Sequence, residues 1–154
     1  MSDVPSGFRR TAALLTAAGA LPFIGLTIGM AVLDPPTDAT ARLWLMVYAS
    51  VILSFLGGIR WGIAIGNPPS NAAPLILSVI PSLAGWVIVP YAILIQAIPS
   101  PAWFLAYACL FGLQLGWDWT SGSVPGWFKP IRLWVSIVVI ACMIAAWAIG
   151  QFSG

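Results

Sequence analysis

Residues 43–66 read LWLMVYASVILSFLGGIRWGIAIG, an apolar run with a single charged side chain, that of Arg60. An α-helix of about 20 apolar residues crosses the roughly 30 Å hydrocarbon core of a lipid bilayer. The run meets this length, and its bulky apolar side chains suit lipid better than water. We therefore predict a transmembrane helix over residues 43–66.

Four further apolar segments satisfy the same criterion, and they cover residues 11–33, 72–96, 101–120 and 130–150. The loops between them are short and rich in Pro, Gly, Asn and Asp, and such loops join antiparallel neighbours. Only 6% of the residues are charged and 60% are hydrophobic, whereas a soluble domain has roughly 25% charged residues. The sequence predicts an all-α polytopic membrane protein, a compact bundle of five transmembrane helices forming one domain over residues 1–154.

The positive charges predict how the bundle is oriented, because Lys and Arg collect in the cytoplasmic loops of membrane proteins. With the N-terminus inside, the outer side holds Arg42 alone. The inner side then holds the other loop cations, Arg9, Arg10, Lys129 and Arg132. We therefore expect the N-terminus inside and the C-terminus outside, which agrees with five crossings.

The composition also excludes several classes of function. The formal net charge is +2, and no basic cluster offers a surface for a nucleic acid. The chain has no His, the commonest general base and metal ligand. Cys109 and Cys142 lack the CxxC spacing of metal and redox sites. We predict no metal, no cofactor, no nucleic-acid partner and no catalysis, since Asp118 is the only carboxylate inside a predicted span.

Small residues recur at every fourth position within residues 50–66. A helix places residues at this spacing on one slowly drifting stripe. Small side chains let a second helix approach closely, and close packing drives helix association in lipid. The small-residue stripe therefore predicts packing against a neighbouring helix of this chain or, alternatively, docking of a helix from another membrane protein. Its members are Ser50, Ser54, Gly58, Gly62 and Gly66.

Arg60 lies on the other side of the same predicted helix, about 200° from Gly58 at 100° per residue. A guanidinium in a membrane must pair, reach the interface or line a wet cavity. Asp118 comes to the same end of the bundle, so we predict a structural Arg60–Asp118 ion pair. Gln114, one turn from Asp118, is expected to extend the network. Two alternatives are a polar site for a lipid headgroup, quinone or anion at Arg60, and simple extension of Arg60 to the interface.

Prolines and tryptophans mark further candidate contacts. Pro81 and Pro90 fall inside the third segment, where proline bends a membrane helix, and a bend there could open a polar pocket beside Trp86. Tryptophans also crowd the predicted inner end, where their rings suit the headgroup layer. The alternative to a structural role is contact with a lipid, pigment or quinone. The candidate contact residues are Arg60, Trp61, Trp86, Gln114 and Trp117.

The chain resembles a known family at three places. These are residues 54–62 (SFLGGIRWG), residues 81–83 (PSL) with Trp86, and Trp127 with the helix of Arg132. The family is typified by transmembrane protein 69 and by small bacterial inner-membrane proteins of unknown function. The resemblance implies a multi-pass protein of a bacterial inner membrane, or of a mitochondrial one, and implies no reaction. The family often has His at the position of Arg60; arginine does not titrate near neutral pH, which disfavours a proton relay.

Two functions stand as hypotheses. The first is a non-enzymatic accessory or assembly subunit of a larger respiratory or photosynthetic complex, embedded in the bilayer and contacting other transmembrane proteins through small-residue faces. The second is a binder or transporter of a lipid, quinone or anion that uses Arg60. A cavity near Arg60 that holds bound non-protein density favours the second hypothesis, and a bundle packed solid there counts heavily against it.

Overall fold

The computed structural model describes residues 4–68, 70–95, 100–122 and 124–152. Asp3, and Gln96 at the predicted end of the third segment, lie outside these residues. The described residues form α-helices and no strand, so the predicted all-α class is confirmed. In chain order the helices are α1 (Ser6–Ala18), α2 (Leu21–Val32), α3 (Thr37–Gly66), α4 (Ala73–Ile95), α5 (Ala102–Thr120) and α6 (Lys129–Phe152).

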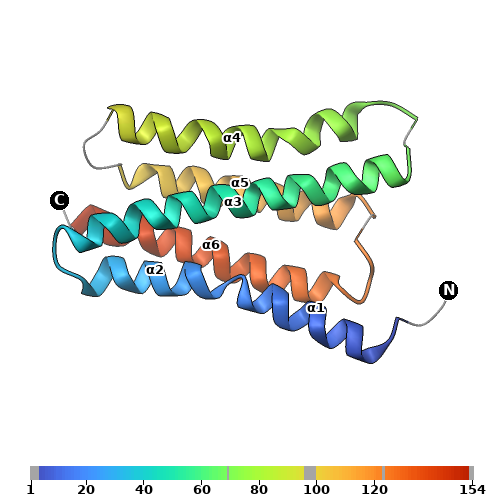
Figure 1. Ribbon diagram of the computed structural model, residues 1–154, viewed down its shortest axis with the longest axis horizontal. Helices are drawn as coiled ribbons and strands as arrows, with labels where there is room; N and C mark the ends of the chain where they lie inside the picture. The colour runs from blue at the N-terminus through green and yellow to red at the C-terminus, as the bar shows by residue number, and fades with distance from the viewer. Residues whose placement is uncertain (1–3, 69, 96–99, 123, 153–154) are drawn as a thin grey trace.

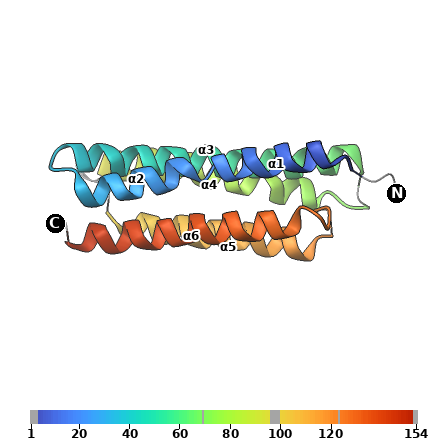
Figure 2. The same cartoon turned by 90° about the horizontal axis from the view of Figure 1, so that it is seen from below.

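The helices lie side by side along one long axis, and from α3 onward each runs antiparallel to the one before it (Figure 1). Seen from below, α1 to α4 form one layer and α5 and α6 form another (Figure 2). We name the two ends of the bundle after the arginine that α3 places near each. The Arg60 end holds the starts of α1, α4 and α6 and the ends of α3 and α5, and the Arg42 end is opposite.

The first apolar segment is two helices, which corrects the prediction of one helix over residues 11–33. The chain is helical from Ser6 and breaks between α1 and α2 at Gly19. Pro22 explains the restart, because proline lacks an N–H and fits the first turn of a helix. The Oη of Tyr48 donates a hydrogen bond of 2.9 Å to the carbonyl of Gly19. Helix α3 therefore supplies a partner at the break.

Helix α3 begins earlier than predicted, at Thr37 rather than at residue 43. Its 30 residues rise about 45 Å, which is more than the hydrocarbon thickness. Arg42 consequently lies within the helix and is buried, which corrects its assignment to an outer loop. Its Nη1 lies beside Gly150 in the last turn of α6, where the carbonyl groups of the helix end favour a cation. The other helices begin and end within a few residues of the predicted limits.

The molecule has the surface of a multi-pass membrane protein. Four described stretches are long and apolar enough to cross a bilayer: Ser6–Val32, Thr37–Gly66, Ala73–Leu94 and Lys129–Phe152. Large apolar side chains are exposed on these stretches, such as Phe55, Trp86 and Leu94, and this surface suits lipid. Helix α5 is not among the four, and it carries the buried polar side chains of Gln114 and Asp118.

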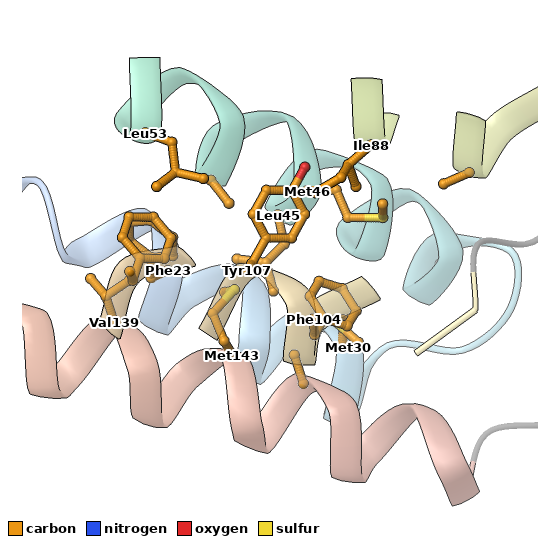
Figure 3. Close-up of a cluster of buried hydrophobic side chains, with 14 of the residues drawn as sticks. Phe23, Met30, Leu45, Met46, Leu53, Ile88, Phe104, Tyr107, Val139 and Met143 are labelled. Atoms are coloured by element: carbon orange, nitrogen blue, oxygen red, sulfur yellow. The ribbon is translucent and has the colours of Figure 1, made fainter. Parts of the chain in front are cut away.

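The core lies where α2, α3, α5 and α6 face one another, and it includes Ile88 and Ala92 of α4. Figure 3 shows Phe23, Tyr107 and Met143 in one cluster of buried side chains. The rings of Phe23 and Phe111 meet edge to face with centroids 5.7 Å apart, a favourable geometry for aromatic pairs. The Oη of Tyr107 lies 2.6 Å from the Oγ of Ser50, so this buried hydroxyl is satisfied. Helix α1 has no buried residue and stands outside this cluster.

Candidate functional site

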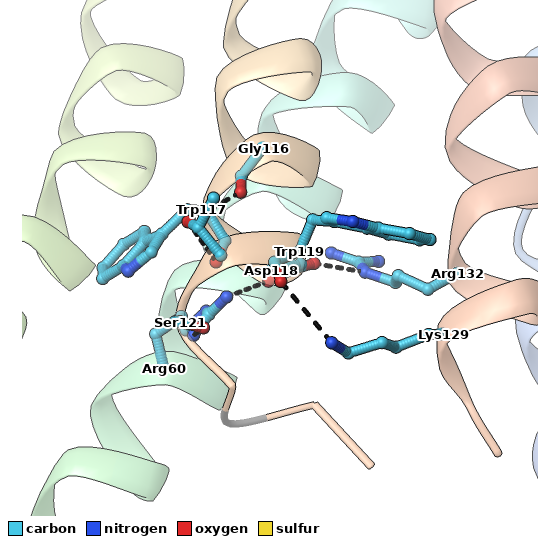
Figure 4. A network of polar contacts seen from close by, with 9 residues as sticks. Arg60, Gly116, Trp117, Asp118, Trp119, Ser121, Lys129 and Arg132 are labelled. Carbon is cyan, nitrogen blue, oxygen red and sulfur yellow. Dashed lines mark hydrogen bonds and ion pairs between the residues drawn. The ribbon is translucent and has the colours of Figure 1, made fainter. Parts of the chain in front are cut away.

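Asp118 joins two arginines at the Arg60 end of the bundle (Figure 4). Its Oδ1 accepts a hydrogen bond from Nη2 of Arg60, and its Oδ2 accepts one of 2.6 Å from Nε of Arg132. The side chains of Arg60, Asp118 and Arg132 are 6%, 7% and 14% exposed. We call these three residues the charged triad. One carboxylate between two guanidinium groups leaves the triad with one net positive charge.

The order of the helices explains why these residues meet. Asp118 lies in the last turn of α5 and Arg132 in the first turn of α6. Because α5 and α6 are antiparallel neighbours, the two positions fall at the same level. Arg60 lies on the inward face of α3, where Leu53, Leu56 and Arg60 are buried at helical spacing. Three helices thus contribute one charged side chain each.

Arg60 is held from several sides. Its Nη1 donates a hydrogen bond of 2.6 Å to the Oγ of Ser121. Its guanidinium carbon lies 4.6 Å from the ring centroid of Trp117, within the range of a cation–π contact. Together with the ion pair to Asp118, these contacts fix the guanidinium. Arg60 is therefore suited to holding Asp118 in place.

Arg132 is held through one nitrogen. Its Nε binds Asp118, and its two Nη groups make no hydrogen bond to the residues that the structure describes. The planar guanidinium fork matches the geometry of carboxylate and phosphate oxygens. Arg132 is therefore the member of the triad with donors left to offer.

A cleft of about 730 Å³ lies against the triad. This volume is within the roughly 300–1,000 Å³ of small-molecule pockets. Leu15 of α1 and Phe55 of α3 are 69% and 63% exposed although both line the cleft, so it opens outward between these helices. All three triad residues line it, and its other walls are mostly apolar. These walls include Ala12, Phe23, Ile59, Trp127, Val135 and Val139.

Aromatic contacts fasten the start of α1 to the loop before α6. The rings of Phe8 and Trp127 meet edge to face, with centroids 6.2 Å apart. The guanidinium of Arg9 lies 5.9 Å from the centroid of the same Trp127 ring. Helix α1 otherwise packs mainly on α6 and has no buried residue. It is the least embedded wall of the cleft, and elements with few buried contacts open most readily.

The other predicted ligand contacts lie away from the cleft. Trp61 and Trp86 are exposed on α3 and α4 and do not line it, so Trp86 faces outward rather than into a pocket. Trp117 contacts Arg60 instead of the cleft. Gln114 is buried, and in the described part of the chain its Nε2 has no hydrogen-bond partner. The expected extension of the network through Gln114 is therefore not formed, and Ser121 is the neighbour that Arg60 uses.

The small-residue stripe is divided between two environments. Ser50 packs on α4, where its Oγ donates a hydrogen bond of 3.0 Å to the carbonyl of Gly85. A Cβ added at Gly58, Gly62 or Gly66 would meet no atom of the described chain within 4 Å, and Ser54 is exposed with them. Within the described chain Ser50 thus packs against α4, whereas Ser54, Gly58, Gly62 and Gly66 lie on an exposed face of α3. The glycine of α3 that lies against α4 is Gly57, whose added Cβ would meet the carbonyl oxygen of Ser78.

Arg132 is the site residue that reasoning from the sequence missed, because it was counted only as a cation of the inner loop. The spacing of Asp118 and Arg132 about the loop between α5 and α6 could have indicated their contact. Asp118 lies about as many residues before this loop as Arg132 lies after it. Two residues placed in this way on an antiparallel helix pair come to one level of the bundle.

Comparison with known proteins places the chain in a family. The chain matches the family model "Protein of unknown function (DUF3429)" over residues 8–148. It is 32% identical to Transmembrane protein 69 of Xenopus tropicalis over 152 residues. The match covers 95% of this chain and 55% of that relative, so the chain spans about half the length of the relative. No solved structure matches. The predicted family is confirmed, and the chain belongs to the DUF3429 family of membrane proteins similar to Transmembrane protein 69.

Proposed function

We propose that this protein binds an amphiphilic molecule of the bilayer in the cleft between α1, α3 and α6, and that it does so without catalysis. The observation that carries the proposal is the combination of apolar walls with one charged group, the triad, in the same cleft. Pockets that bind small molecules have this composition, in which a few polar groups orient a mainly apolar ligand. The opening between exposed side chains of α1 and α3 offers a route from the lipid.

The position of Arg60 along α3 supports the same proposal. Arg42 and Arg60 are eighteen residues apart, which is about 27 Å along a helix. This separation is close to the roughly 30 Å thickness of the hydrocarbon core, so the two arginines fall near its two edges. A ligand with its polar group on the triad then has its apolar part at the depth of the lipid chains.

We also propose five crossings, with the Arg60 end on the inside. Helices α4 and α6 run in the same direction (Figure 1), so the chain must return between them, and α5 is the described element that does so. The described part of the Arg60 end carries Arg9, Arg10 and Lys129 besides the triad, whereas the other end carries Asp34 and Asp38 besides Arg42. This asymmetry follows the positive-inside rule. Reporters fused to the two ends should report opposite sides of the membrane, and reporters on the same side would contradict five crossings.

Filling the cleft should abolish binding. The variant Ala12→Trp places a large ring in the cleft wall and should lower the amount of co-purified or added amphiphile at least tenfold, because a ring and an alkyl chain cannot share the space. The matched control is Ala17→Trp on the exposed side of the same helix, where the residue does not line the cleft. Binding is measured by native mass spectrometry of protein released from neutral detergent. Retained binding in Ala12→Trp, or equal loss in Ala17→Trp, would contradict the proposed site.

A second candidate is an accessory subunit of a larger membrane complex, respiratory or photosynthetic. Its support is the outward face of α3, where the exposed Gly58, Gly62 and Gly66 leave room for another helix. Protein solubilised gently in neutral detergent tests this second candidate. Elution of this chain without any other protein would contradict an accessory-subunit role. The bacterial inner membrane stays a prediction, because the Transmembrane protein 69 relative is from a eukaryote.

A further inference from the structure

We infer that the ligand of the cleft is a singly charged anionic amphiphile, an alkyl chain that ends in one carboxylate or phosphodiester group, and that Arg132 binds the anion. This inference rests on the proposed function and specifies the chemical class of its ligand. It also assigns different roles to the two arginines of the triad. Arg132 contacts the ligand, and Arg60 is a positioning residue that acts through Asp118.

The net charge of the triad indicates the charge of the ligand. Asp118 is shared between Arg60 and Arg132, so the buried group keeps one positive charge. In the described part of the chain, the cleft has no further acidic side chain among its lining residues. A buried charge is costly unless it is paired. A ligand with one negative charge completes the neutralisation, whereas a neutral quinone or alcohol leaves the excess charge in place.

The unused hydrogen-bond donors of Arg132 indicate which arginine binds the anion. The Nη groups of Arg132 make no hydrogen bond within the described chain, and Arg132 lines the cleft. Arg60 is instead engaged by Asp118 and Ser121 and lies against the ring of Trp117. Because Asp118 already holds the Nε of Arg132, its Nη groups are pre-oriented, and preorganised donors lose less entropy on binding.

The apolar walls of the cleft indicate that the anion is attached to an alkyl chain. Leu15, Phe23, Phe55 and Val139 line the same cleft as the charged triad. A small hydrated anion gains little from such walls, since it would have to give up its water for apolar contacts. An alkyl chain gains roughly 0.8 kcal/mol for each CH₂ group that it buries. The site therefore selects an anion that is attached to a chain.

The test titrates matched pairs of amphiphiles into delipidated full-length protein in neutral detergent and counts the bound copies by native mass spectrometry. One pair is phosphatidylglycerol against zwitterionic phosphatidylcholine, and the other is oleate against oleyl alcohol. Wild-type protein should bind the anionic member of at least one pair roughly tenfold more tightly, as expected for hydrogen bonds to a charged group. The pair with the larger preference identifies whether the anion comes from a phospholipid or from a fatty acid.

The variant Arg132→Gln should reduce this preference to within about threefold while neutral members still bind, and Arg132→Lys should restore part of it. The control is Lys129→Gln, which removes a neighbouring cation that lies on Trp119 and does not line the cleft. Equal binding of both members by the wild type would overturn the anionic ligand but leave the proposed function standing. Equal losses in Arg132→Gln and Lys129→Gln would also overturn it, and no binding of any amphiphile would overturn the proposed function itself.

Discussion

Replacing Asp118 with asparagine is expected to lower the free energy of unfolding by about 3–5 kcal/mol. The substitution keeps the size of the side chain and removes its charge. It leaves the guanidinium groups of Arg60 and Arg132 buried beside each other with no carboxylate between them. Losing one partner of a buried ion pair is costly because the remaining charge has neither water nor a counter-ion. Here two charges are left, and they repel each other.

The measurement is thermal unfolding of the purified protein in neutral detergent. At about 2–4 °C per kcal/mol for a chain of this size, the midpoint should fall by roughly 10 °C. The control is Asp34→Asn, because Asp34 is exposed in the loop at the Arg42 end, and its substitution should change stability by no more than about 0.5 kcal/mol. Equal midpoints for the two variants would show that the triad does not stabilise the bundle.

A double variant tests whether the destabilisation comes from the uncompensated guanidinium charges. Adding Arg132→Gln to Asp118→Asn removes one of the two uncompensated guanidinium groups and should recover part of the lost stability. Neighbouring residues in one network are not additive, and the difference between the double variant and the sum of the single variants measures their coupling. Additive losses would contradict a shared carboxylate.

Replacing Gly57 with alanine is expected to lower the free energy of unfolding by about 1–3 kcal/mol. Helices α3 and α4 touch closely at this position, and the added Cβ would meet the carbonyl oxygen of Ser78 and lie 3.2 Å from the Oγ of Ser82. Neither helix can give way locally, because a main-chain carbonyl moves only with its helix. The two helices must therefore separate.

The neighbouring Gly58 is the matched control. A Cβ added there meets no atom of the described chain within 4 Å, and alanine is the better helix former by roughly 0.5–1 kcal/mol. Gly58→Ala should leave the unfolding midpoint unchanged or raise it slightly. A larger loss for Gly58→Ala than for Gly57→Ala would indicate that the small-residue stripe, rather than Gly57, packs against a neighbouring helix.

The glycine pair shows where reasoning from the sequence reaches its limit. A repeat of small residues at every fourth position identifies a face of α3, but it does not say which helix lies against that face. The structure turns this face outward from Ser54 onward and places Gly57 against α4. The break at Gly19 was missed for a related reason, since Pro22 is compatible with a continuous bend or with a new helix.

The sequence by itself determined the helical membrane class and the need for a partner at Arg60, because composition and length decide what can face lipid and because a charge in lipid must be satisfied. It also identified Asp118 as that partner. Only the tertiary structure decided that Asp118 is shared with Arg132, that α1 stands away from α3, and that a cleft remains beside the triad. The physical reason is that these features depend on the order and rotation of packed helices, and the hydrophobic pattern of each helix alone does not specify them.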